Sequence, residues 1–174
     1  MKENYDRILE FILKWEGGKP HKVKGDKGGW TSYGGLTLST MVSLNLDIDK
    51  DGDVDINDLY KVDKSIIDGA FRKEYWNKIN GDSLPAGIDL IMADIAWNSG
   101  VMKAKQFALE GYIDTPEELT ERRKRFYRYL AETTPGYEKF LKGWLNRADD
   151  ALAEAKNLQW QNPITDETMK KFMQ

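Results

Sequence analysis

The sequence predicts an all-α fold that is interrupted by one glycine-rich loop and one acidic loop. Apolar residues recur at helical spacing in several segments, which is the pattern of helices that bury one face. Residues 19–37 are rich in glycine, and residues 47–58 are rich in aspartate. These two segments are where we expect irregular structure instead of helix.

The composition limits the chemistry that this chain can perform. Its 174 residues, 40% of them hydrophobic, suffice for one core. The net charge of −3, from 26 basic and 29 acidic residues, argues against a general nucleic-acid-binding protein. The chain has no cysteine and a single histidine, His21, so thiolate chemistry is excluded and a histidine-based zinc site is disfavoured. If the protein is a hydrolase, carboxylates are its natural catalytic groups.

The N-terminal segment has the pattern of an amphipathic helix. Residues 1–18 mix acidic and apolar side chains, which is not typical of a secretory signal. No apolar run in the chain approaches the roughly 20 residues that a membrane-spanning helix needs. We therefore expect synthesis in the cytoplasm without a signal peptide. Separately, we expect the protein to be a monomer. A substrate outside the membrane would require release by another system.

Periodic apolar positions place the helices of the first two thirds of the chain. A first helix runs to about Trp15, and Ser39 is positioned to cap a short second one. Asp63 is positioned to cap a third helix. Pro85 begins a further helix that is apolar around most of its circumference, so we expect it at the centre of the core.

Two more helices are predicted in the C-terminal third. Thr115, Pro116 and Glu118 have the form of a capping box with proline at the first helical position. The helix that follows is basic, and we expect its charged face either to be solvated or to attract anionic polymers. Its cations are Arg122, Arg123, Lys124, Arg125 and Arg128. Pro135 begins a last long helix with one apolar stripe.

The acidic loop matches a calcium-binding pattern. Residues 47–58 read DIDKDGDVDIND, which fits the 12-residue calcium loop of EF-hand type in register. Gly52 occupies position 6, where the sharp turn needs glycine. The predicted metal ligands are Asp47, Asp49, Asp51, Asp53 (through its backbone carbonyl), Asp55 and Asp58. We predict a structural calcium ion, because so many carboxylates repel one another without a cation.

This loop departs from the standard pattern in two respects. Position 12 is Asp58, where a longer, bidentate glutamate is usual, and this variant resembles the loops of dockerin modules. The chain also has one such loop, whereas calcium sensors usually pair them. The alternative to a calcium site is a solvated acidic turn.

Glu16 is the candidate catalytic acid. It lies where the first helix ends and a glycine turn begins, and both the helix C-terminus and the neighbouring Trp15 favour the uncharged carboxylic acid. Glycosidases use such a protonated carboxyl group to protonate a leaving oxygen. An ordinary exposed glutamate at a frayed helix end is the alternative, and on the residues alone it is the commoner situation.

The sequence around Glu16 resembles a known family. Residues 15–18 read Trp-Glu-Gly-Gly, and residues 26–37 read Asp-Lys-Gly-Gly-Trp-Thr-Ser-Tyr-Gly-Gly-Leu-Thr. These segments closely resemble the pattern of glycoside hydrolase family 108, which is Glu-Gly-Gly followed by Asp-x-Gly-Gly-x-Thr-x-Tyr-Gly-Ile-Thr. Members of that family are N-acetylmuramidases found as phage endolysins and as bacterial secretion activators.

Later segments continue the resemblance in the same order. Tyr75-Trp76, Leu-Pro-Ala-Gly at 84–87 and Asp-Ile-Ala-Trp-Asn-Ser-Gly at 94–100 match segments of the family. Residues 140–147 look like its helical C-terminal region. Residues 105–120 lack the glycine-rich stretch that is more usual in the family, which leaves the boundary of the second region open.

The resemblance implies a lysozyme-like fold and a cell-wall substrate. It implies a catalytic domain over residues 1–111 and a helical peptidoglycan-binding region over residues 112–174, packed together as one globular unit. It also implies cleavage of the β-1,4 bond between N-acetylmuramic acid and N-acetylglucosamine, with Glu16 as general acid. The partners would be peptidoglycan glycan strands and, functionally, a holin or an export system, and the protein would act on the wall or in the periplasm after release.

The other site residues lie in the same segments. Asp26 is the first candidate for a second carboxylate, with a turn-capping role as the alternative. Asp94 is a weaker candidate, because its position one helical turn before Asn98 suits hydrogen bonding better than catalysis. Some lysozyme-like enzymes use a single glutamate. The residues expected to contact substrate are Trp30, Thr31, Tyr33 and Asn98.

Aromatic residues supply candidates for stacking on sugar rings. Besides Trp30 these are Tyr75, Trp76 and Trp97. Aromatic residues at helical spacing more often belong to the core, so we expect only one or two of them to contact the glycan.

Two other functions stay open on the sequence. A lytic transglycosylase would cut the same bond with the same acid but without water, and product mass separates the two reactions. A calcium-ordered, non-catalytic cell-wall-binding or secretion-helper module is the second alternative. A dockerin-like module would be expected to carry two acidic loops, and this chain has one.

Overall fold

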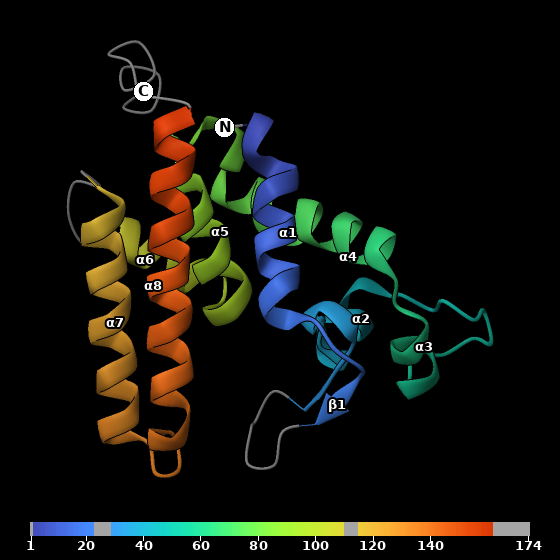
Figure 1. Ribbon diagram of the computed structural model, residues 1–174. Helices are drawn as coiled ribbons and strands as arrows, with labels where there is room; N and C mark the ends of the chain where they lie inside the picture. Colours follow the sequence, from blue (N-terminus) through green and yellow to red (C-terminus); the bar gives the residue numbers. More distant parts are fainter. Residues whose placement is uncertain (1, 23–28, 110–114, 162–174) are drawn as a thin grey trace. The chain divides into compact units, whose positions relative to one another are not determined.

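The computed structural model describes residues 2–22, 29–109 and 115–161. Two compact units make up the chain, one formed by Met1–Ile8 together with Arg72–Gln174 and the other by Leu9–Phe71. Helix α1 (Tyr5–Glu16) begins in the first unit and ends in the second (Figure 1). The first unit is therefore assembled from two separate stretches of the sequence.

The first unit is built around helix α5 (Ile88–Ser99). Each residue from Ile88 to Ala96 is buried, which confirms the prediction that this apolar helix lies at the centre of the core. Helix α5 packs against α6 (Val101–Leu109), α7 (Pro116–Thr133) and α8 (Glu138–Gln161). Helices α7 and α8 lie side by side and run antiparallel (Figure 1).

The first residues of the chain are tied into this unit. Nδ2 of Asn4 donates a hydrogen bond of 2.8 Å to the buried carboxylate of Asp89. The rings of Tyr5 and Trp76 meet edge to face, with 5.2 Å between their centroids. Arg7 forms an ion pair with Glu154 on α8. The short elements of the unit are η1 (Lys2–Asn4), η3 (Arg72–Trp76), η4 (Asn77–Ile79) and η5 (Gly81–Ser83).

The starts of α5, α7 and α8 are determined by a side-chain cap or by a glycine just before the helix. The oxygen of Thr115 accepts the N–H of Glu118 at 3.2 Å, and Pro116 is the first residue of α7, as predicted. Two predicted starts were wrong. Helix α5 begins after Gly87 and not at Pro85, and α8 begins after Gly136 and not at Pro135, because both glycines have a φ of 86°, which no α-helix contains.

The second unit combines the end of α1 with a short hairpin and short helices. Strand β1 (His21–Lys22) pairs antiparallel with β2 (Trp30–Thr31), so the glycine-rich segment contains a short hairpin. Thr37, and not Ser39, caps α2, since its hydroxyl oxygen accepts the N–H of Thr40 at 3.2 Å. Asp63 caps α4 as predicted, at 2.9 Å from the N–H of Ile66. The helices are α2 (Leu38–Leu44), α3 (Ile56–Lys61) and α4 (Lys64–Phe71).

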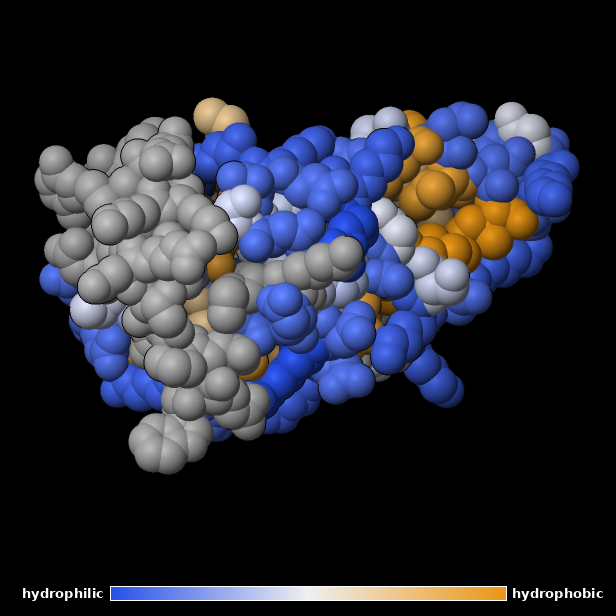
Figure 2. All heavy atoms as spheres, turned by 90° about the horizontal axis from the view of Figure 1, so that it is seen from above, coloured by the Kyte–Doolittle hydropathy of each residue, from blue (hydrophilic) through white to orange (hydrophobic). Residues whose placement is uncertain are grey.

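The all-α, lysozyme-like class is confirmed, since the sheet found in the described ranges is limited to the β1–β2 hairpin. The predicted domain boundary at residues 111 and 112 falls inside the first unit and stays a prediction. Among the described helices, none has the length and apolar character to cross a membrane. The coloured part of the surface in Figure 2 is mainly hydrophilic, with an apolar patch toward the right that is bordered by hydrophilic residues.

Candidate active site

Glu16 is the last residue of α1, and its carboxylate lies against the backbone of Gly35 in η2 (Tyr33–Gly35). A Cβ atom added at Gly35 would lie 2.5 Å from Oε2 and 2.8 Å from Cδ of Glu16. Gly35 also has a φ of 85°, a conformation that strains other residues. Glycine is therefore needed at this position both for the turn and for the space that the carboxylate occupies.

The neighbouring Gly34 anchors this turn in the second unit. Its φ is 77°, and an added Cβ would overlap Cδ1 of Ile67 and lie 3.0 Å from Cδ2 of Leu13. Two backbone hydrogen bonds of Ser32 close the turn. The N–H of Ser32 donates to the carbonyl of Leu36 at 2.9 Å, and the carbonyl of Ser32 accepts the N–H of Gly35 at 3.1 Å. This packing holds the backbone of Gly35 in place beside Glu16.

Three of the predicted substrate contacts lie in the same segment as this turn. Trp30 is half-buried in β2, and Tyr33 is 36% exposed. The hydroxyl of Thr31 donates to the carbonyl of His21 at 3.1 Å across the hairpin, so its oxygen is left as an acceptor. The structure thus brings Trp30, Thr31 and Tyr33 into the loop that carries Gly35. Asp26, the candidate second carboxylate, lies outside the described residues.

Asp94 is the centre of a buried ion cluster in the first unit. Its Oδ1 accepts hydrogen bonds from Nε and Nη2 of Arg147 at 3.0 and 2.7 Å, and Oδ2 lies 2.7 Å from Nη1 of Arg123. Burial alone would raise the pKa of Asp94, but the two guanidinium groups outweigh burial and hold the pKa below its ordinary value. Because this carboxylate is fully buried and paired with two arginines, it is not accessible to a substrate, which argues against Asp94 as the second catalytic carboxylate.

The basic run of α7 does not form one solvated face, and that prediction was wrong for Arg123. Arg123 is 1% exposed and pairs with Asp94, a contact between distant segments that helical spacing does not reveal. Nη1 of Arg122 donates to the carbonyl of Phe107 at 2.9 Å, and Lys124 pairs with Asp149. The cations of the run that stay exposed are Arg125 and Arg128.

Asn98 is exposed near the end of α5, where its Oδ1 accepts a hydrogen bond of 2.9 Å from the hydroxyl of Tyr127. Beside it on the helix, Trp97 meets Tyr75 with 4.6 Å between ring centroids, and both rings are half-buried. Trp76 is fully buried, and its Nε1 donates to Asp82 at 2.9 Å. Trp76 is therefore a core residue and not a sugar platform, whereas Tyr75 and Trp97 stay candidates.

A family model described as Glycosyl hydrolase 108 matches residues 9–100, which is more than half of the chain. The chain belongs to the glycosyl hydrolase 108 family. Membership makes the protein a peptidoglycan hydrolase of the glycosyl hydrolase type. The matched segment of this glycosyl hydrolase 108 member includes the predicted catalytic residues and metal ligands, and it ends before the predicted peptidoglycan-binding region of residues 112–174.

The fold of this glycosyl hydrolase 108 member also matches a solved structure. It is similar to the "Structure of Brucella abortus SagA", with a TM-score of 0.74 and 21% sequence identity. The similarity covers 91% of this chain and 97% of the Brucella abortus chain, and it establishes a shared fold. A comparison with curated proteins finds no match.

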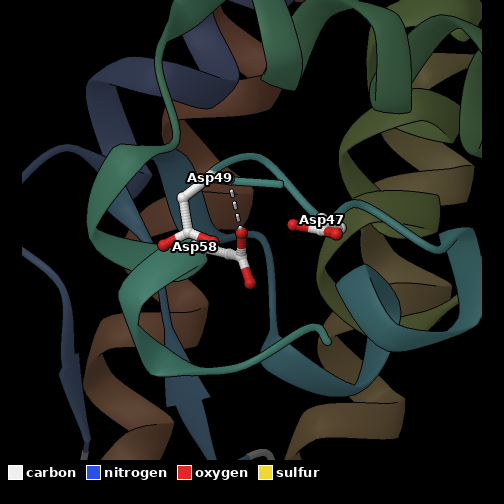
Figure 3. A group of neighbouring side chains, drawn as sticks. All are labelled: Asp47, Asp49 and Asp58. Carbon is white, nitrogen blue, oxygen red and sulfur yellow. Dashed lines mark hydrogen bonds between the residues drawn. The ribbon is translucent and has the colours of Figure 1, made fainter. Parts of the chain in front are cut away.

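Acidic side chains cluster in the second unit of this glycosyl hydrolase 108 member. Carboxylate oxygens of Asp47, Asp49 and Asp58 lie within 4.8 Å of one another (Figure 3), and those of Asp53, Asp55 and Asp58 form a second such group. Asp58 is fully buried and belongs to both groups. The sequence predicted one site that includes all six residues, whereas the structure shows two groups that share Asp58, and Asp51 is in neither group.

The loop is organised by hydrogen bonds to its own carboxylates. Asp47 accepts the N–H groups of Lys50 and Gly52 at 2.6 and 3.0 Å. Asp58 accepts those of Ile48, Asp49 and Asp55 at 2.6, 3.1 and 2.9 Å. These bonds, led by that from Asp55, hold the pKa of Asp58 below its ordinary value despite burial. Neighbouring carboxylates, first Asp51, raise the pKa of Asp53, which is the repulsion that a cation would relieve.

The donor set in this loop fits a hard cation. Oδ1 of Asp49 is buried and has no hydrogen-bond partner among the described residues, while Oδ2 is 2.8 Å from Nζ of Lys61. Asp58 accepts three hydrogen bonds, and because a carboxylate offers about four acceptor positions, one is left for a metal. Oxygen donors of this kind suit calcium or magnesium.

Proposed function

We propose that this protein hydrolyses the β-1,4 bond between N-acetylmuramic acid and N-acetylglucosamine in peptidoglycan, with Glu16 as general acid. The observation that carries the proposal is the position of Glu16, which ends α1 and lies against the turn at Gly35. A family model of glycosyl hydrolases covers this segment, which supports a glycan substrate.

In the proposed reaction, Glu16 protonates the bridging oxygen while positive charge develops on the anomeric carbon. The leaving sugar departs with that proton, and water adds to the anomeric carbon. We assign to Asp26 the role of the second carboxylate. It stabilises the positive charge on the anomeric carbon or accepts the proton of the water. The rings of Trp30 and Tyr33 offer faces for sugar stacking, and the oxygen of Thr31 offers an acceptor for a sugar hydroxyl.

The acidic loop has a structural part in this proposal. A calcium ion would be held by the carboxylates of Asp47, Asp49, Asp51, Asp55 and Asp58 and by the backbone carbonyl of Asp53. Its charge would cancel the mutual repulsion of these side chains. The unpartnered Oδ1 of Asp49 and the free acceptor position of Asp58 support this assignment over a solvated acidic turn.

The experiment compares the clearing of a purified peptidoglycan suspension by the wild type, Glu16→Gln and Glu10→Gln. Glutamine is nearly isosteric with glutamate but has no acidic proton, so Glu16→Gln should clear at least about 100-fold more slowly. Glu10 is exposed on the same helix, so Glu10→Gln should clear like the wild type.

The products and the failures separate the competing functions. Products that contain one added water indicate hydrolysis, whereas anhydro sugars indicate a transglycosylase. Equal clearing by wild type and Glu16→Gln would show that the acid is another residue. If the wild type binds the wall material but clears no preparation of it, the protein is a binding module.

A further inference from the structure

The acidic loop of residues 47–58 and the turn beside Glu16 belong to the same unit, Leu9–Phe71. The turn comprises residues 32–36 and includes Gly35, whose backbone lies against the carboxylate of Glu16. Helix α2 connects the turn to the start of the loop, whereas the loop ends in α3, which α4 follows. The loop thus joins two segments of one unit, and each of these segments reaches the turn.

The connection through α2 is short and well packed. The turn ends one residue before Thr37, whose hydroxyl oxygen accepts the N–H of Thr40 at 3.2 Å and so caps α2. Near the other end of α2, Met41 is fully buried, and its carbonyl accepts the N–H of Leu46 at 3.1 Å. Asp47, the first predicted metal ligand, follows directly. The position of Asp47 is therefore tied to the turn through one short helix.

The connection through α3 and α4 returns to the same turn from the other side. Asp58, the last predicted ligand, lies in α3, which is anchored in the core by the buried side chains of Leu59 and Val62 just after it. Helix α4 begins two residues later and carries Ile67, which is fully buried. A Cβ atom added at Gly34 of the turn would lie 2.1 Å from Cδ1 of Ile67. Helix α4 therefore supports the turn by direct packing.

The predicted ligands come from both connections (Figure 3). Asp47 and Asp49 follow α2, whereas Asp58 belongs to α3, and their carboxylate oxygens lie within 4.8 Å of one another. Oδ1 of Asp49 is buried without a hydrogen-bond partner among the described residues, so the hydrogen bonds of the loop leave a ligand position open. A cation bound here would be attracted by carboxylates of both connections and would hold the end of α2 against the start of α3.

We propose that calcium in the acidic loop holds the turn of residues 32–36 in place beside Glu16 and thereby controls the rate of glycan cleavage. The turn is joined to α2 through the chain and to α4 through Ile67, so fixing these helices fixes Gly35. Without the ion, repulsion between the carboxylates loosens the two connections, and small displacements in an active site cost much of the rate. This inference rests on the proposed function, because it adds regulation by calcium to the site of Glu16.

The test measures the turn itself by amide hydrogen exchange, followed by NMR in calcium and in a chelator. The N–H groups of Ser32 and Gly35 donate to the carbonyls of Leu36 and Ser32, so their exchange reports opening of the turn. We expect calcium, titrated between about 10 μM and 10 mM, to slow this exchange at least about 10-fold. The clearing rate should rise with the same midpoint. Exchange of Ile12, inside α1 of the same unit, should change much less.

Two variants separate binding of the ion from its effect on the turn. Asp49→Asn removes a ligand, so calcium should no longer slow exchange of Gly35 at concentrations that saturate the wild type. Ile67→Val deletes Cδ1, the atom that packs on Gly34, and leaves the loop intact. It should bind calcium like the wild type, yet the slowing of exchange should fall several-fold. Ile66→Val is the matched control, because Ile66 is half-buried on the same helix.

Three results would overturn the proposal. Calcium that raises the melting temperature but leaves exchange of Ser32 and Gly35 unchanged acts on the loop alone. Equal slowing at Ile12 means that calcium stabilises the whole unit and not the turn. Absence of any calcium effect on melting or exchange means that the loop binds no ion.

Failure of the proposed function is recognised separately. If the wild type clears no peptidoglycan but calcium selectively slows exchange of Ser32 and Gly35, the connection from the loop to the turn is supported although the catalytic proposal has failed. If the wild type clears peptidoglycan equally fast in calcium and in chelator, the catalytic proposal stands and control by calcium is refuted.

Discussion

The carboxylate of Glu16 and the backbone of Gly35 are so close that one added carbon at Gly35 would lie 2.5 Å from Oε2. This contact joins the end of a helix to a glycine turn that is itself packed on Ile67 and Leu13. The backbone of Gly35 therefore limits the space beside the proposed acid, and this space can be changed without altering the acid itself.

Gly35→Ala should lower the clearing rate at least about 10-fold, because its methyl group displaces the carboxylate of Glu16. Gly136→Ala is the matched control, since Gly136 has a similar φ of 86° but no described atom within 4 Å of an added Cβ. Both changes add about 1–2 kcal/mol of backbone strain, so their melting temperatures should fall alike. Equal loss of activity in the two variants would show that strain, and not displacement of Glu16, is responsible.

Asp94→Asn should lower the free energy of unfolding by about 3–5 kcal/mol, because two buried guanidinium groups lose their counter-ion. Urea titration at neutral pH measures this difference. Asp6→Asn, at an exposed position of α1, should change stability by less than about 0.5 kcal/mol. A small effect of Asp94→Asn would mean that the cluster is not needed to hold α5, α7 and α8 together.

From the buried ion cluster of Asp94 we also predict a pH dependence of the free energy of unfolding. The pKa of Asp94 is lower in the folded protein than in the unfolded chain, where it is about 3.9. Its contribution is thus fully present above the unfolded pKa and is lost as the pH falls through the lower folded pKa. Urea midpoints between about pH 5 and pH 2 should fall less steeply for Asp94→Asn than for the wild type. Parallel curves would exclude Asp94 as a source of the acid sensitivity.

Calcium should raise the melting temperature of the wild type relative to a chelator. A ligand at 100 times its dissociation constant adds about 2.7 kcal/mol to the free energy of unfolding. Asp49→Asn should reduce the calcium effect, because Oδ1 of Asp49 is a buried carboxylate oxygen without a hydrogen-bond partner among the described residues. Asp6→Asn should keep the full effect. If calcium leaves the wild type unchanged, the loop is a solvated acidic turn.

Trp76 and Trp97 should respond differently to replacement by leucine. Trp76 is buried, contacts Tyr5 and donates to Asp82, so Trp76→Leu should lower the free energy of unfolding by about 3 kcal/mol. Trp97 is half-buried, and loss of a sugar-stacking face should raise KM about 2- to 10-fold with a smaller change in kcat. An unchanged KM in Trp97→Leu would remove Trp97 from the list of platforms.

The helical class and several helix ends were predictable because they depend on local physics. Apolar residues around the circumference of Ile88–Ser99 placed this helix in the core, and the side chains of Asp63 and Thr115 marked helix starts. The acidic loop was predictable for the same reason, since its ligand spacing is contained in 12 consecutive residues.

Contacts between distant segments were not predictable from spacing. Nothing in the run around Arg123 shows that this arginine differs from Arg125, because the difference is the carboxylate of Asp94 on another helix. The starts of α5 and α8 depend on the positive φ of Gly87 and Gly136, which the prolines before them obscured. The hydrogen bond from Tyr127 on α7 to Asn98 on α5 likewise needs both helices in place.

The order of the two units along the chain has a consequence for biosynthesis. Leu9–Phe71 is an insertion in a host unit that is made from Met1–Ile8 and Arg72–Gln174. The ion pair of Arg7 and Glu154 joins positions 147 residues apart, so it links the two separate stretches of the host unit. During vectorial synthesis, all residues of the inserted unit leave the ribosome before Glu154 is made. The contact of Arg7 with Glu154 can therefore form only after the ribosome has translated most of α8, later than the contacts of Asn4 with Asp89 and of Tyr5 with Trp76.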